Sequence, residues 1–483
     1  MRRAWRVVAL ATVLLVAGCT GGGDRTPART PPTGSAAPPV SSAPPAAGTG
    51  NPFGAHWDWS RYDQFRPYLR QLGGSATYHE LSWCHVERVA GRPDWSPVDR
   101  IARRTRDLGI TLNLKIRIGT CWATGGTAAH TRGAVGKTES RMPLDLAAYQ
   151  TFVRSVVTRY APYGVRQYAI ENEVNAPQYW AGSPEEYARL VRAAATAVHE
   201  ADPAARVVDS GISSVAYGFG IVDRLLREGR ADDAVAAYRA YFQRRIGTRG
   251  QKIPAVGDAT RLRAALANAA NVRNVAFLAA TEGLIAEGVV QLRQVHFYEH
   301  VDGVPALLDY LRARTPAGVP VEAWEVGQFW RDGDGDPAGR AAEMVKVVCQ
   351  LVAGGVRQVM WLPLAYHPDN RAGGEVRYGL LDPDGTERDA GRMMAALVAA
   401  ARGATVTAVA VGGLTGVAFA RPGETDLVLW STSGAEVAVT GGPELRGGPV
   451  GATPHAAGQV RVGATPVLLR SGQPLDDVLA ALR

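Results

Sequence analysis

Two short segments run from apolar residues into carboxylates, as a buried strand does where it reaches a functional surface. The first is Tyr168–Asn175, where the apolar approach gives way to Asn172 and Glu173. The second is Val319–Gly327, which carries Glu325. In a closed parallel barrel the carboxyl ends of the strands and the loops after them hold the chemistry. Two glutamates at such ends predict paired acid/base chemistry, which glycoside hydrolysis requires: one carboxyl group protonates the leaving oxygen, and the other attacks the sugar or activates water.

The elements that must position these glutamates begin at Phe53, where short apolar strands start to alternate with amphipathic helices. This alternation favours βα units and a parallel sheet. A doubly wound open sheet would show a glycine-rich phosphate turn after its first strand, and Gly54–Trp59 is not such a turn. We therefore expect an α/β fold, a (β/α)8 TIM barrel, over residues 51–402. Its strands are expected at Phe53–Trp57, Ala76–Trp83, Ile110–Ile118, Gln167–Asn172, Arg206–Ser210, Gln291–Tyr298, Val319–Glu325 and Gln358–Pro363.

Two regions fall outside this pattern. Tyr217–Val290, between the fifth and sixth strands, is strongly helical in composition and either walls the cleft or decorates the periphery. Residues 403–476 contain short alternating segments between Gly/Pro turns and predict a small C-terminal all-β sandwich. Without an obvious aromatic platform, this domain is expected to be structural rather than a carbohydrate-binding module. Residues 477–483 are expected to form a short helix or tail.

The N-terminus has the features of an export signal. Residues 1–18 carry three arginines before the apolar run Val7–Val16, which is too short to span a bilayer as a stable helix. The run Val16-Ala17-Gly18-Cys19 resembles a bacterial lipobox, in which the cysteine is lipidated; ordinary secretion is the alternative. Residues 19–50 are rich in Pro, Ala, Gly and Ser and predict a disordered tether. We expect an exported protein, anchored to the cell membrane through Cys19 or extracellular.

Charge argues against nucleic acid as a partner. The 483 residues carry a formal net charge of +8, and removal of the leader leaves 50 basic against 45 acidic residues. This surplus is spread along the chain, with no basic block interleaved with aromatic residues. We expect a monomer whose partner is a carbohydrate substrate.

Several segments resemble those of clan A glycoside hydrolases, most closely family 39, and the resemblance extends over roughly Phe53–Ser471. Leu81–Glu87 with Gly91–Trp95 resembles the second strand and loop of the clan, and Gly379–Asp382 resembles its exit from the eighth strand. The pair Asn172-Glu173 is the most specific match, although Val174 stands where the clan often has proline.

The resemblance implies roles for the site residues. Glu173 would be the acid/base and Asn172 would bond the sugar 2-hydroxyl, while Glu325, in a segment that resembles the nucleophile strand, would be the nucleophile. His296 and Tyr298 lie in a segment resembling strand six, whose tyrosine hydrogen-bonds the nucleophile. A platform beneath the sugar is implied at the end of the eighth strand, at Trp361.

Other residues compete for these roles or extend the site. Glu322 lies three residues before Glu325 and is expected to point to the opposite face of its strand. Glu171 shares the side of Glu173, and only the Asn-Glu pattern separates the two. His56 and Arg117 are further contacts to substrate, although a buried structural pair would explain either. Sugar rings stack on aromatic side chains, so several tryptophans near strand ends are expected to line the cleft: Trp57, Trp83, Trp122, Trp180 and Trp330.

We expect neither a metal nor an organic cofactor. Asp332–Asp336 with Glu343 has the acidic spacing of a calcium loop, but Pro337 occupies the position that needs glycine, and Asp336-Pro337 instead predicts a helix start. Cys84 and Cys121 follow neighbouring predicted strands and would meet an oxidising environment after export, so we expect a disulfide between them.

The sequence thus predicts a retaining glycosidase that acts on a poly- or oligosaccharide with two glutamates separated by about 5–5.5 Å. Two alternatives stay open: a surface carbohydrate-binding protein (or a transglycosylase) on a glycosidase scaffold, and a barrel lyase or aldolase. The last would need a Schiff-base lysine, for which Lys115 in the third strand is the candidate.

Overall fold

The computed structural model describes residues 50–132, 136–247, 252–330, 336–366, 371–372, 375–440, 445–456 and 458–482. Its centre contains eight parallel strands in two four-stranded sheets, each overlapping a strand expected from the sequence. The first sheet consists, in order, of β1 (Phe53–Ala55), β11 (Val359–Trp361), β9 (Val321–Val326) and β8 (Arg293–Phe297). The second consists of β2 (Ala76–Ser82), β3 (Thr111–Arg117), β6 (Gln167–Ile170) and β7 (Arg206–Val208).

The two sheets meet along two seams. At one seam, bridges between Val208 and Leu292 and between Ile212 and Val295 join β7 to β8. At the other, β1 runs so close to β2 that a Cβ atom on Gly54 would lie 2.2 Å from the carbonyl oxygen of Ala76, which is why glycine is needed there. Side chains from both sheets form one interior cluster: Ala76, Tyr78, Ala169, Val208, Leu292, Trp324 and Met360.

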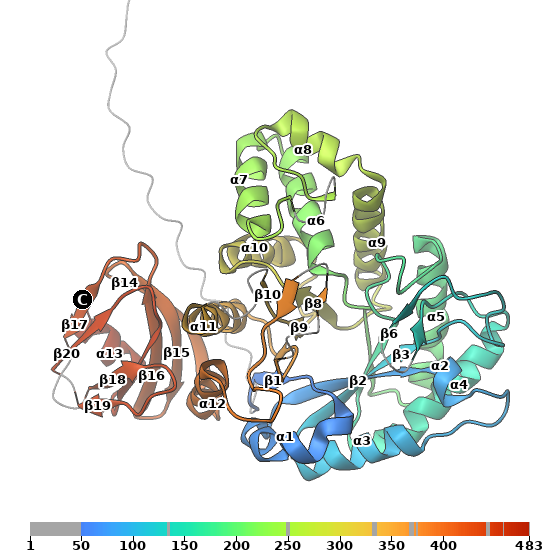
Figure 1. The fold of residues 1–483 in the computed structure, drawn as a ribbon, viewed down its shortest axis with the longest axis horizontal. Helices are drawn as coiled ribbons and strands as arrows, with labels where there is room; N and C mark the ends of the chain where they lie inside the picture. Colours follow the sequence, from blue (N-terminus) through green and yellow to red (C-terminus); the bar gives the residue numbers. More distant parts are fainter. Residues whose placement is uncertain are drawn as a thin grey trace, which may run out of the picture. The chain divides into compact units, whose positions relative to one another are not determined.

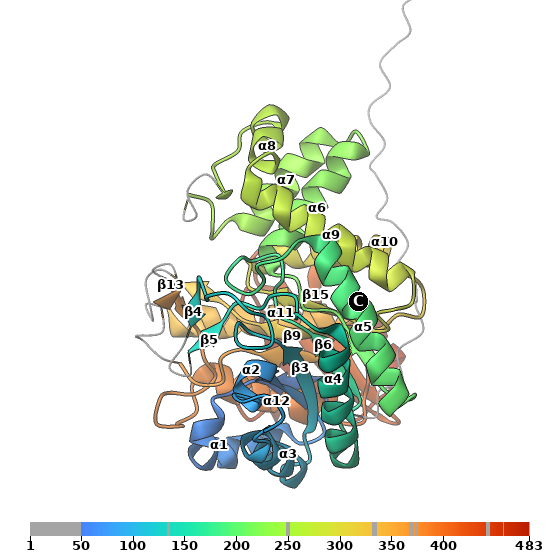
Figure 2. The same ribbon diagram turned by 90° about the vertical axis from the view of Figure 1, so that its right-hand side faces the viewer.

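Helices follow the strands and cover the outer faces of the sheets (Figures 1 and 2). Side-chain caps set where two of these helices begin. Asp145 caps the helix that starts at Leu146, and Ser183 with Glu186 forms a capping box on the helix that starts at Pro184. The helices are α1 (Tyr62–Leu69), α2 (Trp83–Val86), α3 (Ser96–Asp107), α4 (Leu146–Tyr160), α5 (Pro184–Ala201), α10 (Val304–Arg314), α11 (Pro337–Ala353) and α12 (Asp389–Ala401).

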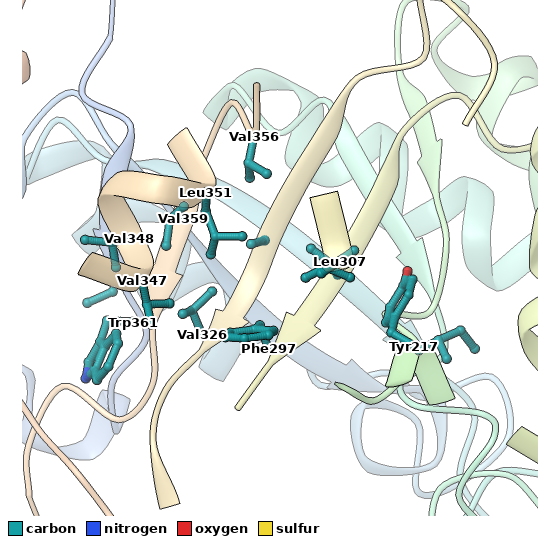
Figure 3. Close-up of a cluster of buried hydrophobic side chains, with 14 of the residues drawn as sticks. Tyr217, Phe297, Leu307, Val326, Val347, Val348, Leu351, Val356, Val359 and Trp361 are labelled. Atoms are coloured by element: carbon teal, nitrogen blue, oxygen red, sulfur yellow. The ribbon is translucent and has the colours of Figure 1, made fainter. Parts of the chain in front are cut away.

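Apolar side chains on the outward faces of β8, β9 and β11 pack together with α11 (Figure 3). Phe297, Val326 and Trp361 are fully buried in this layer together with Val347 of the helix. Because successive strand residues point to opposite faces, the polar residue before Phe297, which is His296, faces the interior. The outer packing therefore fixes which side chains the strands present inward.

The segment between β7 and β8 is helical, as expected. It consists of α6 (Ser214–Arg227), α7 (Ala231–Phe242), α8 (Ala259–Leu266) and α9 (Ala269–Ala286). Its helices share an aromatic contact, because the ring of Phe242 lies 5.2 Å from that of Phe219 and 5.1 Å from that of Tyr238. We refer to α6–α9 as the helical insertion.

Short antiparallel strands occur in three loops, those that follow β3, β9 and β11. One pair is β4 (Thr131–Arg132) and β5 (Lys137–Thr138), and a three-stranded sheet contains β10 (Phe329–Trp330), β12 (Arg371–Ala372) and β13 (Glu375–Arg377). Most of the acidic stretch considered for calcium lies outside the described residues. Asp336 caps α11 by accepting from Gly339 N, and Glu343 is paired with Arg244 and accepts from Val301 N at 3.1 Å.

The C-terminal region is an all-β domain. Its six-stranded antiparallel sheet contains, in order, β14 (Thr405–Val411), β15 (Leu414–Arg421), β16 (Glu424–Ser431), β21 (Val467–Ser471), β18 (Arg446–Pro449) and β19 (His455–Ala456). A separate pair is formed by β17 (Val437–Thr440) and β20 (Gln459–Val462), and the chain ends in α13 (Leu475–Ala481). One face of the large sheet shares a core with the pair and α13. The other face joins the main core, where Phe419 contacts Phe53 with ring centroids 6.1 Å apart.

The leader, Cys19 and nearly all of the tether lie outside the described residues. Within the described part of the chain, no helix is long and apolar enough to cross a membrane. Export and anchoring therefore stay predictions from the sequence.

Candidate active site

Glu173 and Glu325 lie at the carboxyl ends of two parallel strands, Glu173 just after β6 and Glu325 near the end of β9. One carboxylate oxygen of each and a ring nitrogen of His296 lie within 4.8 Å of one another. The side chain of Glu325 is 11% exposed and that of Glu173 is 15% exposed. The fold thus brings two largely shielded carboxylates, 152 residues apart in the sequence, into one site.

The backbone turns sharply at Glu173. Glu171 has φ 69° and Glu173 has φ 42°, the left-handed region that residues other than glycine rarely adopt. Hydrogen bonds hold both residues there, from Glu171 N to Ile116 O at 3.0 Å and from Glu173 N to Ser210 O at 3.1 Å. Such strain costs on the order of 1–3 kcal/mol per residue and persists only where the surroundings impose it.

The helical insertion supplies part of that support. Arg273 of α9 donates to the carbonyl oxygens of Val174, Asn175, Trp180 and Gly182 at 2.8–3.3 Å. One guanidinium group therefore gathers four carbonyls of the loop that follows Glu173. Of the two readings of the insertion left open by the sequence, a peripheral decoration is the weaker, because the insertion contacts the loop after Glu173 directly.

Three donors converge on Glu325. Tyr78 Oη and Lys115 Nζ donate to its Oε1 at 2.9 and 2.7 Å, and Tyr298 Oη donates to its Oε2 at 3.0 Å. Burial, with a further contribution from the Glu325 charge, raises the pKa of Tyr78 well above its usual value, so its hydroxyl keeps its proton. These hydrogen bonds stabilise negative charge on Glu325 and fix the direction of its carboxylate.

A β-bulge in β9 places Glu325 on the inward face. Gln294 pairs with Glu322 and His296 with Glu325, so two steps along β8 correspond to three along β9. Glu322 also points inward, because it accepts from Gln167 Nε2 of the opposite sheet at 3.1 Å. The sequence prediction that Glu322 points to the opposite face is therefore wrong, since it assumed an unbroken alternation. Glu322 instead lies further from the carboxyl ends of the strands than Glu325 does, because its partner Gln167 is at the amino end of β6.

His296 and Lys115 connect the two glutamates. His296 Nδ1 is 2.9 Å from Glu173 Oε1 and 3.5 Å from Glu325 Oε2, and its Nε2 is 3.2 Å from Lys115 Nζ. Lys115 also donates to Asn172 Oδ1 at 2.7 Å. Both connecting side chains are fully buried.

The position of Lys115 bears on two other chemistries. A Schiff-base lysine must offer a free amine, whereas Lys115 Nζ is engaged in an ion pair with Glu325 Oε1 at 2.7 Å. Glu173, His296 and Glu325 also have the donor atoms of a cation site. The ammonium group 2.7 Å from one carboxylate and 3.2 Å from the imidazole opposes a second cation there by charge repulsion.

Glu171, the alternative to Glu173, is buried in a separate ion-pair network. Its Oε1 accepts from Ile118 N at 2.8 Å and its Oε2 lies 3.4 Å from Arg117 Nε. Burial raises the pKa of Glu171 to about 7, although Arg117 opposes the shift. Arg117 is 1% exposed and also donates to Glu80 at 3.0 Å and Thr138 O at 2.9 Å. Arg117 was expected to contact substrate; the structure corrects this, because its donors tie β3 to the β4–β5 pair.

His56 packs against Tyr78, one of the donors to Glu325. Its ring stacks on Tyr78 with centroids 4.1 Å apart, and its Nδ1 lies 3.0 Å from Tyr78 O. Burial lowers the pKa of His56 to about 4 against the opposing charge of Glu325, so the imidazole is neutral near pH 7. His56 thus orders the tyrosine that donates to Glu325.

Trp361 does not form the platform that the resemblance implies. It is fully buried in the outer layer with α11, and its Nε1 donates to Tyr378 O at 3.0 Å (Figure 3). The neighbouring Met360 belongs to the interior cluster instead. This correction follows from strand alternation, because Trp361 and Met360 point to opposite faces.

The other tryptophans differ in exposure. Trp57, Trp83 and Trp180 are 3%, 2% and 0% exposed and belong to the core, so the expectation that they line the cleft is corrected. Trp122 is 40% exposed, with its Nε1 anchored to a backbone carbonyl at 2.7 Å, and can still meet a ligand. The side chain of Trp330 lies outside the described residues.

Cys84 and Cys121, the pair expected from the sequence, are joined by a disulfide with their Cα atoms 5.8 Å apart. The bond links α2, which follows β2, to the loop after β3. Cys349 is a buried free thiol on α11, and burial raises its pKa. The loops beside the site are therefore covalently tied.

Tyr78 was missed from the sequence, and Lys115 was considered only as a Schiff-base candidate. The signal lay in the alternation of the third strand, whose apolar residues alternate with Asn113, Lys115 and Arg117. Helices cover the outer face of a parallel sheet, so the apolar set must face them and the polar set must face inward. This argument places Lys115 inside without any resemblance.

Comparison with known proteins shows a likeness in fold. No family model and no curated protein matches the chain. A family 39 glycoside hydrolase from Bacteroides cellulosilyticus WH2 superposes with a TM-score of 0.62 at 13% identity, over 87% of this chain and 81% of that one. This chain has the fold of family 39 glycoside hydrolases.

Two further family 39 structures agree. The enzyme from Xanthomonas axonopodis pv. citri gives a TM-score of 0.57 at 13% identity, over 90% of this chain and 96% of that one. The β-xylosidase from Caulobacter crescentus gives 0.56 at 15% identity, over 89% and 98%. The family 39 fold thus extends over both the parallel sheets and the C-terminal β domain.

Proposed function

We propose that this chain is a retaining glycoside hydrolase in which Glu173 is the acid/base and Glu325 the nucleophile, and that its two sheets close into a (β/α)8 barrel. The separation of the two carboxylates is the observation that carries the proposal. Oxygen atoms within 4.8 Å suit the retaining geometry of about 5–5.5 Å, whereas an inverting pair lies about 6.5–9.5 Å apart. The family 39 fold supports the same reaction class.

In the first step, Glu325 attacks the anomeric carbon as Glu173 protonates the departing oxygen. The donors on Glu325 keep the attacking carboxylate ionised and aimed. The bond from the anomeric carbon to the leaving oxygen breaks, a glycosyl ester to Glu325 forms, and Glu173 is left as a carboxylate.

In the second step, Glu173 takes a proton from a water molecule that attacks the same carbon. The ester bond breaks, Glu325 recovers its charge, and Glu173 is again protonated. Two displacements at one carbon retain its configuration. No atom other than those of sugar, water and the two glutamates changes its bonding.

Two variants test the assignment with an activated aryl glycoside. Glu325→Ala removes the covalent step and should nearly abolish turnover on every substrate. Glu173→Ala should be least harmful where the leaving group departs without protonation, and it should accumulate a glycosyl-enzyme on Glu325. Added azide should then release a glycosyl azide of retained configuration, measurable by NMR.

Glu322→Ala combined with Glu173→Ala is the matched control, since it removes a further inward glutamate of the same strand as Glu325 and should leave the azide reaction intact. An inverted product, or peptide mass spectrometry that finds the label on Glu322, refutes the assignment. Saturable binding of a glycan without turnover across a glycan panel would instead establish the carbohydrate-binding alternative.

We also propose that the protein is exported, is anchored through Cys19 and acts as a monomer on a poly- or oligosaccharide. The disulfide between Cys84 and Cys121 supports an oxidising compartment. A related fold from Caulobacter crescentus is described as a monomeric β-xylosidase.

A further inference from the structure

We propose that Lys115 is a positioning residue that sets the hydrogen-bonding state of both glutamates at once, through Glu325 directly and through His296 to Glu173. This inference deepens the proposed function and rests on it for its catalytic meaning. Its structural part, the proton position on His296, stands without any assumption about activity.

The ammonium group of Lys115 is enclosed by acceptors. Its Nζ has three donor hydrogens, and it lies 2.7 Å from Glu325 Oε1, 2.7 Å from Asn172 Oδ1 and 3.2 Å from His296 Nε2. The ring of Tyr78 lies 4.2 Å away and offers its π face to the same charge. Each donor has one partner, so the group has a single satisfied orientation.

This arrangement determines the tautomer of His296. An ammonium group can only donate, so His296 Nε2 must accept and carries no proton. The neutral imidazole then has its proton on Nδ1, 2.9 Å from Glu173 Oε1, and donates there. Lys115 is linked to Glu173 through two successive hydrogen bonds, by way of His296. It therefore sets the direction of the hydrogen bond between His296 and Glu173.

The tautomer of His296 also decides which carboxyl oxygen of Glu173 carries the proton. Because Oε1 accepts from His296, the carboxylic acid carries its proton on the other oxygen, Oε2. In the first step that proton passes from Oε2 to the leaving oxygen, and in the second Oε2 takes a proton from water. His296 and Lys115 transfer no proton; they hold Oε1 as an acceptor throughout.

The first test is spectroscopic and needs no substrate. In the full chain labelled with ¹⁵N-histidine, two-bond ¹H–¹⁵N spectra should show His296 as the neutral tautomer protonated on Nδ1, with the signal assigned by its loss in His296→Gln. Lys115→Met keeps the length of the buried stem and removes the donor, and it should abolish this preference. A wild-type His296 protonated on Nε2, or an unchanged tautomer in Lys115→Met, overturns the proposal.

The second test is kinetic. Lys115→Met should lower kcat on the order of 100-fold with little change in KM, and the loss should be larger for poor leaving groups than for activated aryl glycosides, because the acid is misaligned. Asn113→Ala is the matched control, two residues earlier on the same strand and buried, with an Oδ1 that has no hydrogen-bond partner in the described structure. It should leave the leaving-group dependence unchanged.

The outcomes separate the two proposals. An equal loss on all leaving groups shows that Lys115 acts only on Glu325 or on folding, and overturns the coupling to Glu173. A wild-type protein without glycosidase activity refutes the proposed function, while the histidine spectra still decide the tautomer. The wild-type spectrum alone can refute the inference, so the test does not depend on a folded variant.

Discussion

Replacing Gly211 by alanine should disturb the site through His296. Gly211 has φ +65°, and an ideal Cβ there would lie 2.3 Å from His296 Nε2, 2.8 Å from its Cδ2 and 2.9 Å from the amide carbon of Gln294. The imidazole cannot simply retreat, because Lys115 and Glu173 hold it on opposite sides at 3.2 and 2.9 Å. The added methyl group must therefore break at least one of these contacts or move the strand.

Gly229 provides the matched control for the magnitude. It has φ +75° and no atom within 4 Å of an ideal Cβ, so Gly229→Ala pays only the cost of a left-handed backbone, about 1–2 kcal/mol. Gly211→Ala adds the cost of overpacking, about 1–3 kcal/mol. We expect a total loss in the free energy of unfolding of about 2–5 kcal/mol at Gly211.

Urea unfolding followed by tryptophan fluorescence measures both variants, and turnover of an aryl glycoside measures the site. Gly211→Ala should lose activity on the order of 100-fold, as expected when an oriented catalytic hydrogen bond is removed. Gly229→Ala should keep its kcat. Equal destabilisation by the two substitutions, or full activity in Gly211→Ala, would refute the claim that His296 is held without room to move.

Three further outcomes follow. Glu171 keeps its proton in the folded state up to a pKa of about 7, whereas the unfolded carboxyl group loses it near 4.5, so the contribution of Glu171 to stability should fall by about 3 kcal/mol as pH rises between these values. Glu171→Gln should make the stability measured by urea unfolding fall less steeply over this pH range than in the wild type, and an unchanged dependence on pH would contradict the assignment. Arg273→Met should cost about 1–3 kcal/mol and speed proteolysis of residues 174–182; protection equal to wild type would mean that the guanidinium does not hold the loop. Cys19→Ser should move the protein from the membrane fraction to the soluble exported fraction, and unaltered membrane retention would exclude a lipid anchor on Cys19.

The strands were predictable because each is a short apolar run between helices, and this pattern follows from burial on both sides of a parallel sheet. The pairing of Glu173 with Glu325 was also visible, since both end such runs. The orientation of Glu322 was not, because a bulge adds a residue without any local mark in the sequence. The direction of the Trp361 ring was predicted wrongly for a related reason. The resemblance identifies the position at the end of the strand, but packing against α11 decides which face of the sheet the ring lies on.

The role of Arg273 could not be read from the sequence at all. It lies about 100 residues after Glu173, in a helix whose composition says only that it is helical. Its four carbonyl partners are backbone groups, which leave no trace in residue type. Contacts of this kind become visible only when the chain is folded.

At Glu173 the left-handed backbone and the proposed catalytic role favour different residues. Asn tolerates that conformation better than Glu, so Glu173→Asn relieves backbone strain while it deletes the proposed acid. A library selected for thermal resistance alone would therefore drift toward asparagine or glycine at this position and lose turnover as it gained stability. Directed evolution of a hardier enzyme from this scaffold needs an activity screen in every round, and position 173 is where a selection without one would go wrong first.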